Sequence, residues 1–204
     1  NYPDAPEATK KQFVDRCYAQ AQRLTSLLRD ISTLNRIDDA PDLMGKEEVV
    51  DIMELVRGIE KDVHLQLQER HMKFDNQMPE RVLVHGNRSL LYSIFRNLTD
   101  NAINYAGEHT TITLRAQLDD DDNIAGLPQR WKFSFSDNGV GVPAEHLPRL
   151  FERFYRVDKG RSRKMGGTGL GLAIVKNAVL LHGGTISVTN NLTGGLCFRF
   201  TLSE

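Results

Sequence analysis

Apolar residues in the first part of the chain recur at alternating spacings of three and four positions. This seam consists of Val14, Cys17, Ala21, Leu24, Leu28 and Ile31, and is broadened by Phe13, Leu27 and Leu34. The pattern predicts a helix from about Thr9 to Arg36 with a heptad face of the kind found in coiled coils. Because so wide an apolar face is unstable alone in water, we expect a second helix to cover it, from a partner chain or from sequence before residue 1. Packing against its own domain is the less favoured interpretation.

After a polar stretch at 38–42, which is typical of a linker, the pattern changes repeatedly between strand and helix periods. Strands are predicted at 47–50, 73–77, 81–85, 111–118, 131–135, 186–188 and 196–202. Helices are predicted at 51–70, 87–105, 143–154 and from a glycine-rich loop to about residue 181. Asp51 and Asn87 are residue types that favour the N-cap, so they mark the starts of the first two helices. His182 followed by Gly183 is typical of a helix C-terminus, so we interpret this histidine as structural.

The predicted helix that ends near Tyr105 carries an unusual polar face. Asn97, Asn101 and Asn104 stand at i, i+4 and i+7, one above another, beside an apolar stripe. Amides disfavour helix interiors because they compete for the backbone, so three together suggest a shared polar partner. An amide oxygen is a hard, neutral ligand suited to Mg²⁺ that already carries phosphates. On spacing alone, a solvated polar face is the better-supported alternative.

Composition and charge narrow the function classes. The chain has 204 residues, 40% hydrophobic and 26% charged, which suits one globular domain with an extension. A net charge of −1 provides no overall field for nucleic acid or a membrane surface. Cys17 and Cys197 lie far apart without a CxxC pattern, so both are interpreted as reduced structural residues. The run of four acids at 119–122 lacks EF-hand spacing, so a solvated hairpin loop is favoured over a calcium site.

The chain shows no apolar run of membrane-spanning length and no signal sequence. It begins at Asn1 without a methionine, which we interpret as a fragment cut from a longer protein. We therefore expect a cytoplasmic portion, without membrane contact of its own, whose parent is anchored elsewhere.

The strand at 131–135 runs directly into Asp137-Asn138-Gly139-Val140-Gly141. An acid at a strand end, followed by alternating glycines, places a carboxylate where the backbone bends closely around a flat ligand. Carboxylates accept hydrogen bonds from exocyclic amines, so adenine is a natural partner. The DxGxG pattern alone is weak, because many tight turns share it.

A cationic stretch follows, and then a glycine-rich loop. Its cations are Arg153, Arg156, Lys159, Arg161, Arg163 and Lys164, opposed only by Asp158. Regular aromatic interleaving is lacking, so phosphate binding by a mobile lid is favoured over nucleic acid. Glycines at 167, 169 and 171 allow backbone N–H groups to approach an anion at a helix start. The spacing fits neither a Walker A loop nor a Rossmann fingerprint.

Taken in order, the polar-face helix, DxGxG, Phe151-Glu152-Arg153-Phe154-Tyr155-Arg156, the lid and Gly166-Gly167-Thr168-Gly169-Leu170-Gly171-Leu172 form a specific series. The series closely resembles the catalytic, ATP-binding domain of sensor histidine kinases, which are gyrase-like Bergerat-fold ATPases. This resemblance implies an α+β fold, a two-layer sandwich with a mixed, mostly antiparallel sheet and helices on one face. It also implies that residues 1–38 are the second helix of the dimerisation and histidine phosphotransfer domain, 39–45 a linker and 46–204 the catalytic domain.

The resemblance also implies roles for particular residues. Asn101 would ligate Mg²⁺, Asn97 would assist near the phosphates and Tyr105 would border the nucleotide. Asp137 would accept the adenine amine, while Gly139 and Gly141 would shape the base pocket. Arg156 would approach the terminal phosphate. The phosphate chain would be wrapped by Gly167, Thr168, Gly169, Leu170, Gly171 and Leu172. The family usually has Lys at the position of Asn104, so lid cations such as Lys159 would replace that phosphate-facing charge.

The residue at position 97 bears on whether the γ-phosphoryl group of ATP goes to a histidine or to water. Gyrase-type relatives place Glu there as the base that activates water, whereas Asn has no basic side chain. A neutral imidazole needs no base, so the resemblance implies transfer of the ATP γ-phosphoryl to a histidine, then to a response-regulator aspartate. The chain's histidines are His64, His71, His85, His109, His146 and His182. None has the family's acceptor context, so we expect the acceptor before residue 1 and a fragment that binds ATP without labelling itself.

The resemblance also implies a homodimeric parent in the bacterial inner membrane, with a response regulator as partner and no nucleic acid. Three alternatives stay open: a same-fold ATPase or chaperone-like machine, a protein-serine kinase like the anti-sigma factors, and a degenerate kinase that serves as a dimer scaffold. The first is disfavoured by Asn97, the second by the leading heptad helix. The third is supported only by Asn104.

Overall fold

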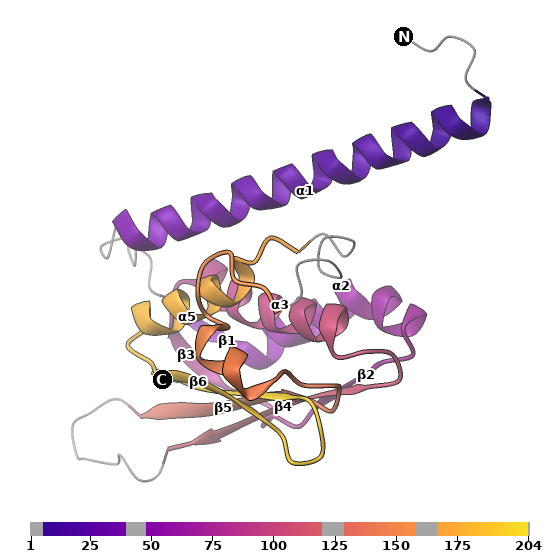
Figure 1. Ribbon diagram of the computed structural model, residues 1–204. Coiled ribbons are helices and arrows are strands. Elements are labelled where there is room, and N and C mark those ends of the chain that lie inside the picture. Colours follow the sequence, from indigo (N-terminus) through magenta and orange to yellow (C-terminus); the bar gives the residue numbers. More distant parts are fainter. Residues whose placement is uncertain (1–5, 40–47, 120–128, 158–166, 204) are drawn as a thin grey trace.

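The computed structural model describes residues 6–39, 48–119, 129–157 and 167–203, and consists of a long helix above a two-layer α+β domain (Figure 1). The helices are α1 (Glu7–Asp39), α2 (Ile52–Glu69), α3 (Arg88–Tyr105) and α5 (Gly171–Leu181), with a 3₁₀ helix η2 (Ala144–Arg149). The strands are β1 (Glu48–Asp51), β2 (Lys73–Asn76), β3 (Leu83–Gly86), β4 (Thr111–Leu118), β5 (Arg130–Asp137), β6 (Ile186–Asn190) and β7 (Leu196–Ser203).

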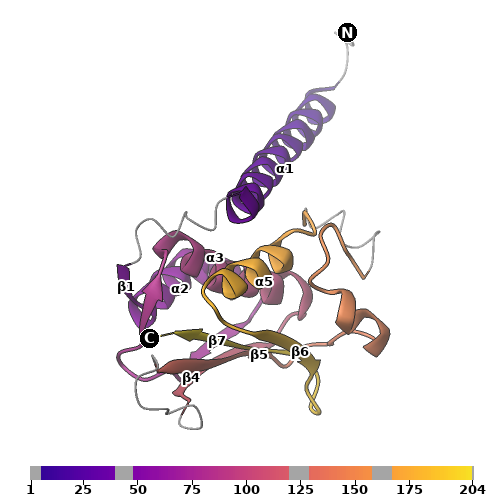
Figure 2. The same ribbon diagram turned by 90° about the vertical axis from the view of Figure 1, so that its left-hand side faces the viewer.

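A five-stranded sheet in the order β2-β4-β5-β7-β6 forms one layer of the domain. Strand β2 runs parallel to β4, and the other neighbouring pairs are antiparallel. Helices α2, α3 and α5 cover one face of this sheet, and the opposite face carries no helix (Figure 2). A separate antiparallel pair, β1 with β3, lies at the side of the helical layer. This mixed, mostly antiparallel two-layer arrangement is the predicted fold class.

The core is formed by buried residues that alternate with more exposed ones along the strands. In β5 every second residue is buried, so Phe133 and Phe135 point toward the helices. The ring of Phe95 on α3 meets Phe133 edge-on at 5.5 Å, and Phe133 stacks on Phe200 of β7 at 5.1 Å. Aromatic pairs of this geometry add to the area that they bury. They hold α3 rigidly over the centre of the sheet, which fixes the direction of its polar face.

The predicted caps are present. The Asp51 carboxylate accepts a hydrogen bond from the Met53 N–H at 2.9 Å and starts α2. The Asn87 side-chain oxygen accepts from Ser89 N at 3.0 Å and starts α3. The ring of His182, 6% exposed, accepts the Asn87 N–H at 3.1 Å and so ties the end of α5 to the start of α3. The structural interpretation of His182 is confirmed.

One expectation about local structure needs correction. The helix predicted over 143–154 is wrong: only the 3₁₀ helix η2 forms, followed by turns. Pro148 lies inside η2 and lacks the N–H that an α-helix needs, while Phe154 has φ 62° and cannot continue a helix. The strands predicted at 73–77 and 81–85 both form, as β2, which pairs with β4, and as β3, which pairs with β1.

The apolar face of α1 divides into two parts. Toward the N-terminus it is uncovered, with Val14 63% and Leu28 69% exposed. Toward the C-terminus of α1, Leu34 is buried against Leu170 and Ile174, at and after the start of α5 in the helical layer. The less favoured interpretation, packing on its own domain, therefore holds for the last turns of α1, and the rest of the face lacks a partner among the described residues.

Candidate functional site

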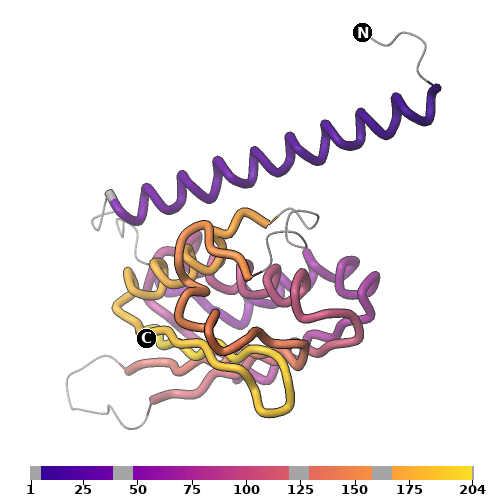
Figure 3. Tube along the Cα trace, in the orientation of Figure 1, coloured from indigo at the N-terminus to yellow at the C-terminus, as the bar shows by residue number. Residues whose placement is uncertain are grey.

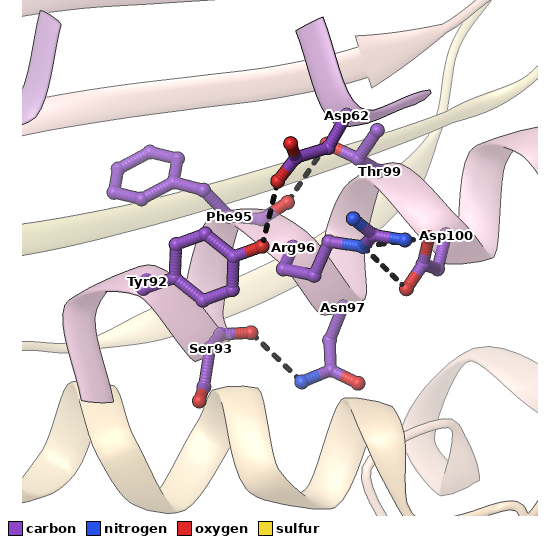
Figure 4. A network of polar contacts seen from close by, with 8 residues as sticks. All are labelled: Asp62, Tyr92, Ser93, Phe95, Arg96, Asn97, Thr99 and Asp100. Carbon is purple, nitrogen blue, oxygen red and sulfur yellow. Dashed lines mark hydrogen bonds and ion pairs between the residues drawn. The ribbon is translucent and has the colours of Figure 1, made fainter. Parts of the chain in front are cut away.

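The amide face of α3 is directed toward the start of α5. The Asn97 side-chain nitrogen donates to the Ser93 carbonyl oxygen at 2.8 Å, which orients its amide (Figure 4). A Cβ built on Gly171, the first residue of α5, would lie 2.7 Å from the Asn97 amide oxygen. Glycine at 171 therefore allows this oxygen to sit against the helix start. The amides of Asn101 and Asn104, both half-buried, form no hydrogen bond within the described residues and stay available as ligands.

A guanidinium without a partner lies close to this face. The Nε and Nη2 atoms of Arg156 are enclosed and have no hydrogen-bond acceptor within the described ranges. A Cβ built on Gly167 would lie 2.6 Å from the Tyr105 hydroxyl and 3.8 Å from Arg156 Nη2, so these three residues converge. A buried charge without hydrogen bonds is costly. These two N–H donors of Arg156 are therefore available to an anion next to Gly167.

The loop before α5 supplies backbone donors. Helix α5 has no side-chain N-cap hydrogen bond, so N–H groups of its first turn are free for an anion. Gly169, at φ 76°, accepts a hydrogen bond from the Phe154 N–H at 2.8 Å, which joins the loop to the segment that carries Arg156. The side chain of Leu170 is fully buried, so it contributes packing and only its backbone can face a ligand.

A second cluster surrounds Asp137, the last residue of β5. Its carboxylate is 7% exposed and accepts the Gly139 N–H at 2.9 Å. Burial raises the pKa of Asp137, and hydrogen bonds from the backbone of Gly139 and Leu196 act in the opposite direction. A Cβ on Gly139 would lie 2.2 Å from the Ala106 carbonyl oxygen, so the loop presses directly on the end of α3. Asp137 thus lies near the C-terminal end of α3 although it comes from the other layer.

The β6–β7 hairpin completes this cluster, and the sequence interpretation missed it. Gly195, at φ 85°, packs so closely that a Cβ there would lie 2.1 Å from the Asp137 carbonyl oxygen. The Asn191 side chain donates to the same oxygen at 3.0 Å. The Asn190 side chain forms two hydrogen bonds with Val142. Its oxygen accepts the Val142 N–H at 3.0 Å, and its nitrogen donates to the Val142 carbonyl oxygen at 2.7 Å. The paired glycines at 194–195 were a possible signal, but they also suit an ordinary turn.

Helix α1 also reaches the site, which no local pattern indicated. Thr168 donates its hydroxyl to the Asp30 carboxylate at 2.8 Å and accepts the Leu170 N–H at 3.2 Å. Burial raises the pKa of Asp30, with the Thr168 hydrogen bond opposing it. Arg153 forms an ion pair with Asp38 at 2.8 Å. The chain trace shows that the C-terminal part of α1 lies over the helical layer (Figure 3).

The predicted residues therefore assemble into two adjoining groups at the end of α3. Asn97, Tyr105, Arg156 and the loop at 167–171 form one group, and Asp137 with Gly139 forms the other. They are named the anion-binding group and the base-binding group after the roles expected from the sequence. Gly141, at φ 65°, supports the latter against Asn190. Leu172 packs on the core. Of the expected lid cations, Lys159, Arg161, Arg163 and Lys164 lie outside the described residues.

A metal would have few protein ligands here. The described residues contain no cluster of three or more His, Cys, Asp or Glu side chains suited to a metal ion. The free amide oxygens of Asn101 and Asn104 are of a type that fits Mg²⁺, which binds through one or two protein oxygens and substrate phosphates.

Comparison with known proteins identifies the family of this fold and site. Residues 86–204 match the family model described as histidine kinase-, DNA gyrase B-, and HSP90-like ATPase. The chain belongs to this family. The resemblance seen in the ordered motifs is thereby confirmed, and the matched range contains every predicted site residue of this ATPase domain.

Individual relatives of this ATPase domain are sensor kinases. The phosphate regulon sensor protein PhoR of Haemophilus influenzae is 32% identical over 196 residues, covering 96% of this chain and 43% of PhoR. The structure of the mycobacterial sensor histidine kinase MprB is 27% identical, with a TM-score of 0.62 over 78% of this chain and 97% of that one. The histidine kinase ThkA in complex with the response regulator TrrA superposes over 100% of this chain and 53% of that chain, with a TM-score of 0.71 and 20% identity. The last likeness concerns the fold alone.

The chain spans less than half the length of PhoR. Within the part that the structure describes, no helix combines the length and hydropathy needed to cross a bilayer.

Proposed function

We propose that this chain is the ATP-binding catalytic region of a sensor histidine kinase, which transfers the γ-phosphoryl group of Mg-ATP to a histidine. The observation that carries the proposal is the convergence of the Asn97 amide, the unpartnered Arg156 guanidinium and the start of α5 around side-chain-free loop positions. The sensor kinase names of the relatives support the same conclusion.

The anion-binding group would hold the triphosphate. Backbone N–H groups at 167–171 would bind the phosphate chain, with Arg156 near the terminal phosphate. Asn101 would hold Mg²⁺, with Asn97 and Asn104 beside it. Bound Mg²⁺ would supply charge neutralisation at the phosphate oxygens.

The base-binding group would recognise adenine. The Asp137 carboxylate would accept a hydrogen bond from the exocyclic amine, within a pocket shaped by Gly139 and Gly141. The Tyr105 hydroxyl lies next to Gly167, so Tyr105 would border the nucleotide. Asp137 is held by backbone N–H groups and is therefore pre-oriented before any ligand arrives.

The absence of a base at position 97 favours transfer to histidine over hydrolysis. An amide cannot take a proton from water, and the nearby Asp100 carboxylate is paired with Arg96 at 2.9 Å. A neutral imidazole nitrogen attacks the γ-phosphorus with its own lone pair, the bond to the bridging oxygen breaks and ADP leaves. Such a transfer depends mainly on positioning and charge neutralisation, which these residues provide.

The parent protein would supply the remaining parts. Residues 1–38 would be the second helix of a dimerisation and phosphotransfer domain, 39–45 a linker and 46–204 the catalytic domain. The uncovered apolar face of α1 suits a homodimer that also presents the acceptor histidine. A response regulator, the partner seen with ThkA, would then receive the phosphoryl group, and the parent would be anchored in the bacterial inner membrane.

Four of the six histidines are held by burial, a hydrogen bond or ring stacking, and the exposed His64 and His85 lack the sequence context of the family's acceptor. His182 is buried, His146 bonds the Tyr155 hydroxyl at 2.6 Å and His71 stacks on His109 at 4.9 Å. We therefore expect the chain to bind ATP without phosphorylating itself.

Calorimetry with a non-hydrolysable ATP analogue and Mg²⁺, followed by incubation with γ-labelled ATP, tests both parts. We expect saturable binding at one site, weakened roughly tenfold or more by Arg156→Gln because a charged hydrogen bond is lost. The matched control Arg57→Gln, on the exposed surface of α2, should bind like the wild type. Absence of binding would refute the nucleotide site, and stoichiometric acid-labile label on the chain would refute the expectation about its histidines.

A further inference from the structure

The face of the sheet that carries no helix contains a hollow of about 570 Å³. It is lined by β4, the end of β5 and the β6–β7 hairpin. Thr113, Arg115 and Ser136 alternate with the buried residues of β4 and β5 that face the helices, so the hollow lies on the other side of the sheet. Pockets for small molecules commonly have volumes of about 300–1,000 Å³. Its size therefore suits a ligand larger than a single ion, at a place distinct from the proposed triphosphate site.

Two guanidinium groups stand on opposite sides of this hollow. Arg115 of β4 and Arg199 of β7 are both in register with Ser134 of β5, so the three residues form one row across the uncovered face. Since neighbouring strands lie about 4.8 Å apart, the two arginine backbones are separated by about 10 Å. Arg115 is bonded to Gln77 on the β2 side and Arg199 to Thr189 on the β6 side, so both long side chains can bind one anionic group by turning inward over β5.

The charges of these arginines are not neutralised. Arg115 donates its Nε–H to the Gln77 side-chain oxygen at 2.7 Å, and Arg199 donates to the Thr189 hydroxyl at 3.2 Å. Both partners are neutral, and neither arginine forms an ion pair within the described ranges. Each guanidinium keeps further N–H donors, which bind phosphate and carboxylate oxygens well.

The other lining groups are mostly hydroxyls and amides. Thr111 and Thr113 present hydroxyls from β4, and Leu192 is the apolar lining residue. One wall is already fixed: the Asn138 side-chain oxygen accepts the Thr111 N–H at 2.6 Å. Asp137 is the acid among the lining residues, and it is almost fully buried. The hollow is therefore cationic at two points and rich in hydrogen-bonding groups.

The geometry points to a binding site for a small phosphorylated polyol in this hollow, with the phosphate between Arg115 and Arg199 and the hydroxyls against the β4 threonines and the hairpin amides. The phosphate of such a ligand binds both guanidinium groups. The hydroxyls of the ligand then bind the threonine hydroxyls and the hairpin amides. The site does not depend on the nucleotide function of the other face.

Titration of glucose 6-phosphate into the ¹⁵N-labelled chain, followed by NMR shifts and calorimetry, tests this site. We expect saturable shifts at β4, β5 and 190–193, and binding that is roughly tenfold weaker for glucose and for inorganic phosphate, since each lacks one half of the interactions. Arg115→Gln and Arg199→Gln should each weaken binding by roughly tenfold or more. Arg57→Gln is the matched surface control.

Arg156→Gln separates this site from the nucleotide site, because that residue lies on the helical side of the molecule. Glucose 6-phosphate binding should remain unchanged in this variant, while nucleotide binding falls. The proposal is overturned if no saturable binding occurs, if the shifts centre on 167–173, or if Arg156→Gln weakens binding and the two β-strand variants do not.

Discussion

Replacement of Asp137 by Asn examines base recognition most directly. In the wild type the carboxylate accepts the Gly139 N–H at 2.9 Å and a second backbone N–H, and it offers its remaining acceptor capacity to a ligand. In Asp137→Asn the amide oxygen can keep the Gly139 bond. Its NH₂ group then faces the adenine amine, so that a donor meets a donor.

The magnitude follows from the loss of one charge-assisted hydrogen bond. Such a bond contributes about 1.5–3 kcal/mol, which corresponds to a loss of adenine nucleotide affinity of roughly 10- to 150-fold. Inosine diphosphate carries a carbonyl oxygen in place of the amine, and that oxygen can accept from the new NH₂. We therefore expect the wild type to prefer ADP and Asp137→Asn to lose or reverse the preference.

The assay is calorimetric titration of ADP and inosine diphosphate into both proteins. Because burial raises the pKa of Asp137, its ionised form is less favourable in the folded protein than in the unfolded chain. The neutral Asn should therefore not lower the free energy of unfolding at pH 7, which urea unfolding checks. An unchanged ratio of the two affinities in a folded variant would refute the assignment of Asp137 to the base.

Local signals in the sequence predicted the structure correctly wherever a feature depends on a single helix or strand. Asn87 and Asp51 cap the predicted helices because capping needs only the two or three following N–H groups. The amide face of α3 follows from helical periodicity, and Gly171 is required by Asn97 on the neighbouring helix. The motifs could therefore be placed on the correct elements before any contact was known.

Long-range contacts were not predictable in the same way. Thr168 and Asp30 are separated by 138 positions, and no periodicity links a threonine in a loop to a carboxylate on a remote helix. The contact of Gly195 with Asp137 likewise depends on how the β6–β7 hairpin folds over the end of β5. The hollow between Arg115 and Arg199 exists only because sheet order brings β4, β5 and β7 together.

Three further variants test hydrolysis, packing and pH dependence. Asn97→Glu places a base where water could be activated, so the ratio of ATP hydrolysis to histidine transfer should rise in the parent kinase; an unchanged ratio in a phosphate-release assay would count against this role. Gly139→Ala should lower the free energy of unfolding by about 1–3 kcal/mol or more, since its Cβ would lie 2.2 Å from the carbonyl oxygen of the α3 C-cap, whereas Gly58→Ala, with open space around it, should not destabilise. The third variant concerns Asp30, whose carboxylate accepts the Thr168 hydroxyl and whose pKa is raised by burial. An acid with a raised pKa binds its proton more tightly in the folded state, so its cost is fully present above the folded pKa and is relieved as pH falls through that value toward 3.8. Relative to Asp30→Asn, the wild type should therefore gain stability on acidification from pH 7 to about pH 4 in urea unfolding, and a relative loss would show that the ionised form is the one that holds α1 on the catalytic domain.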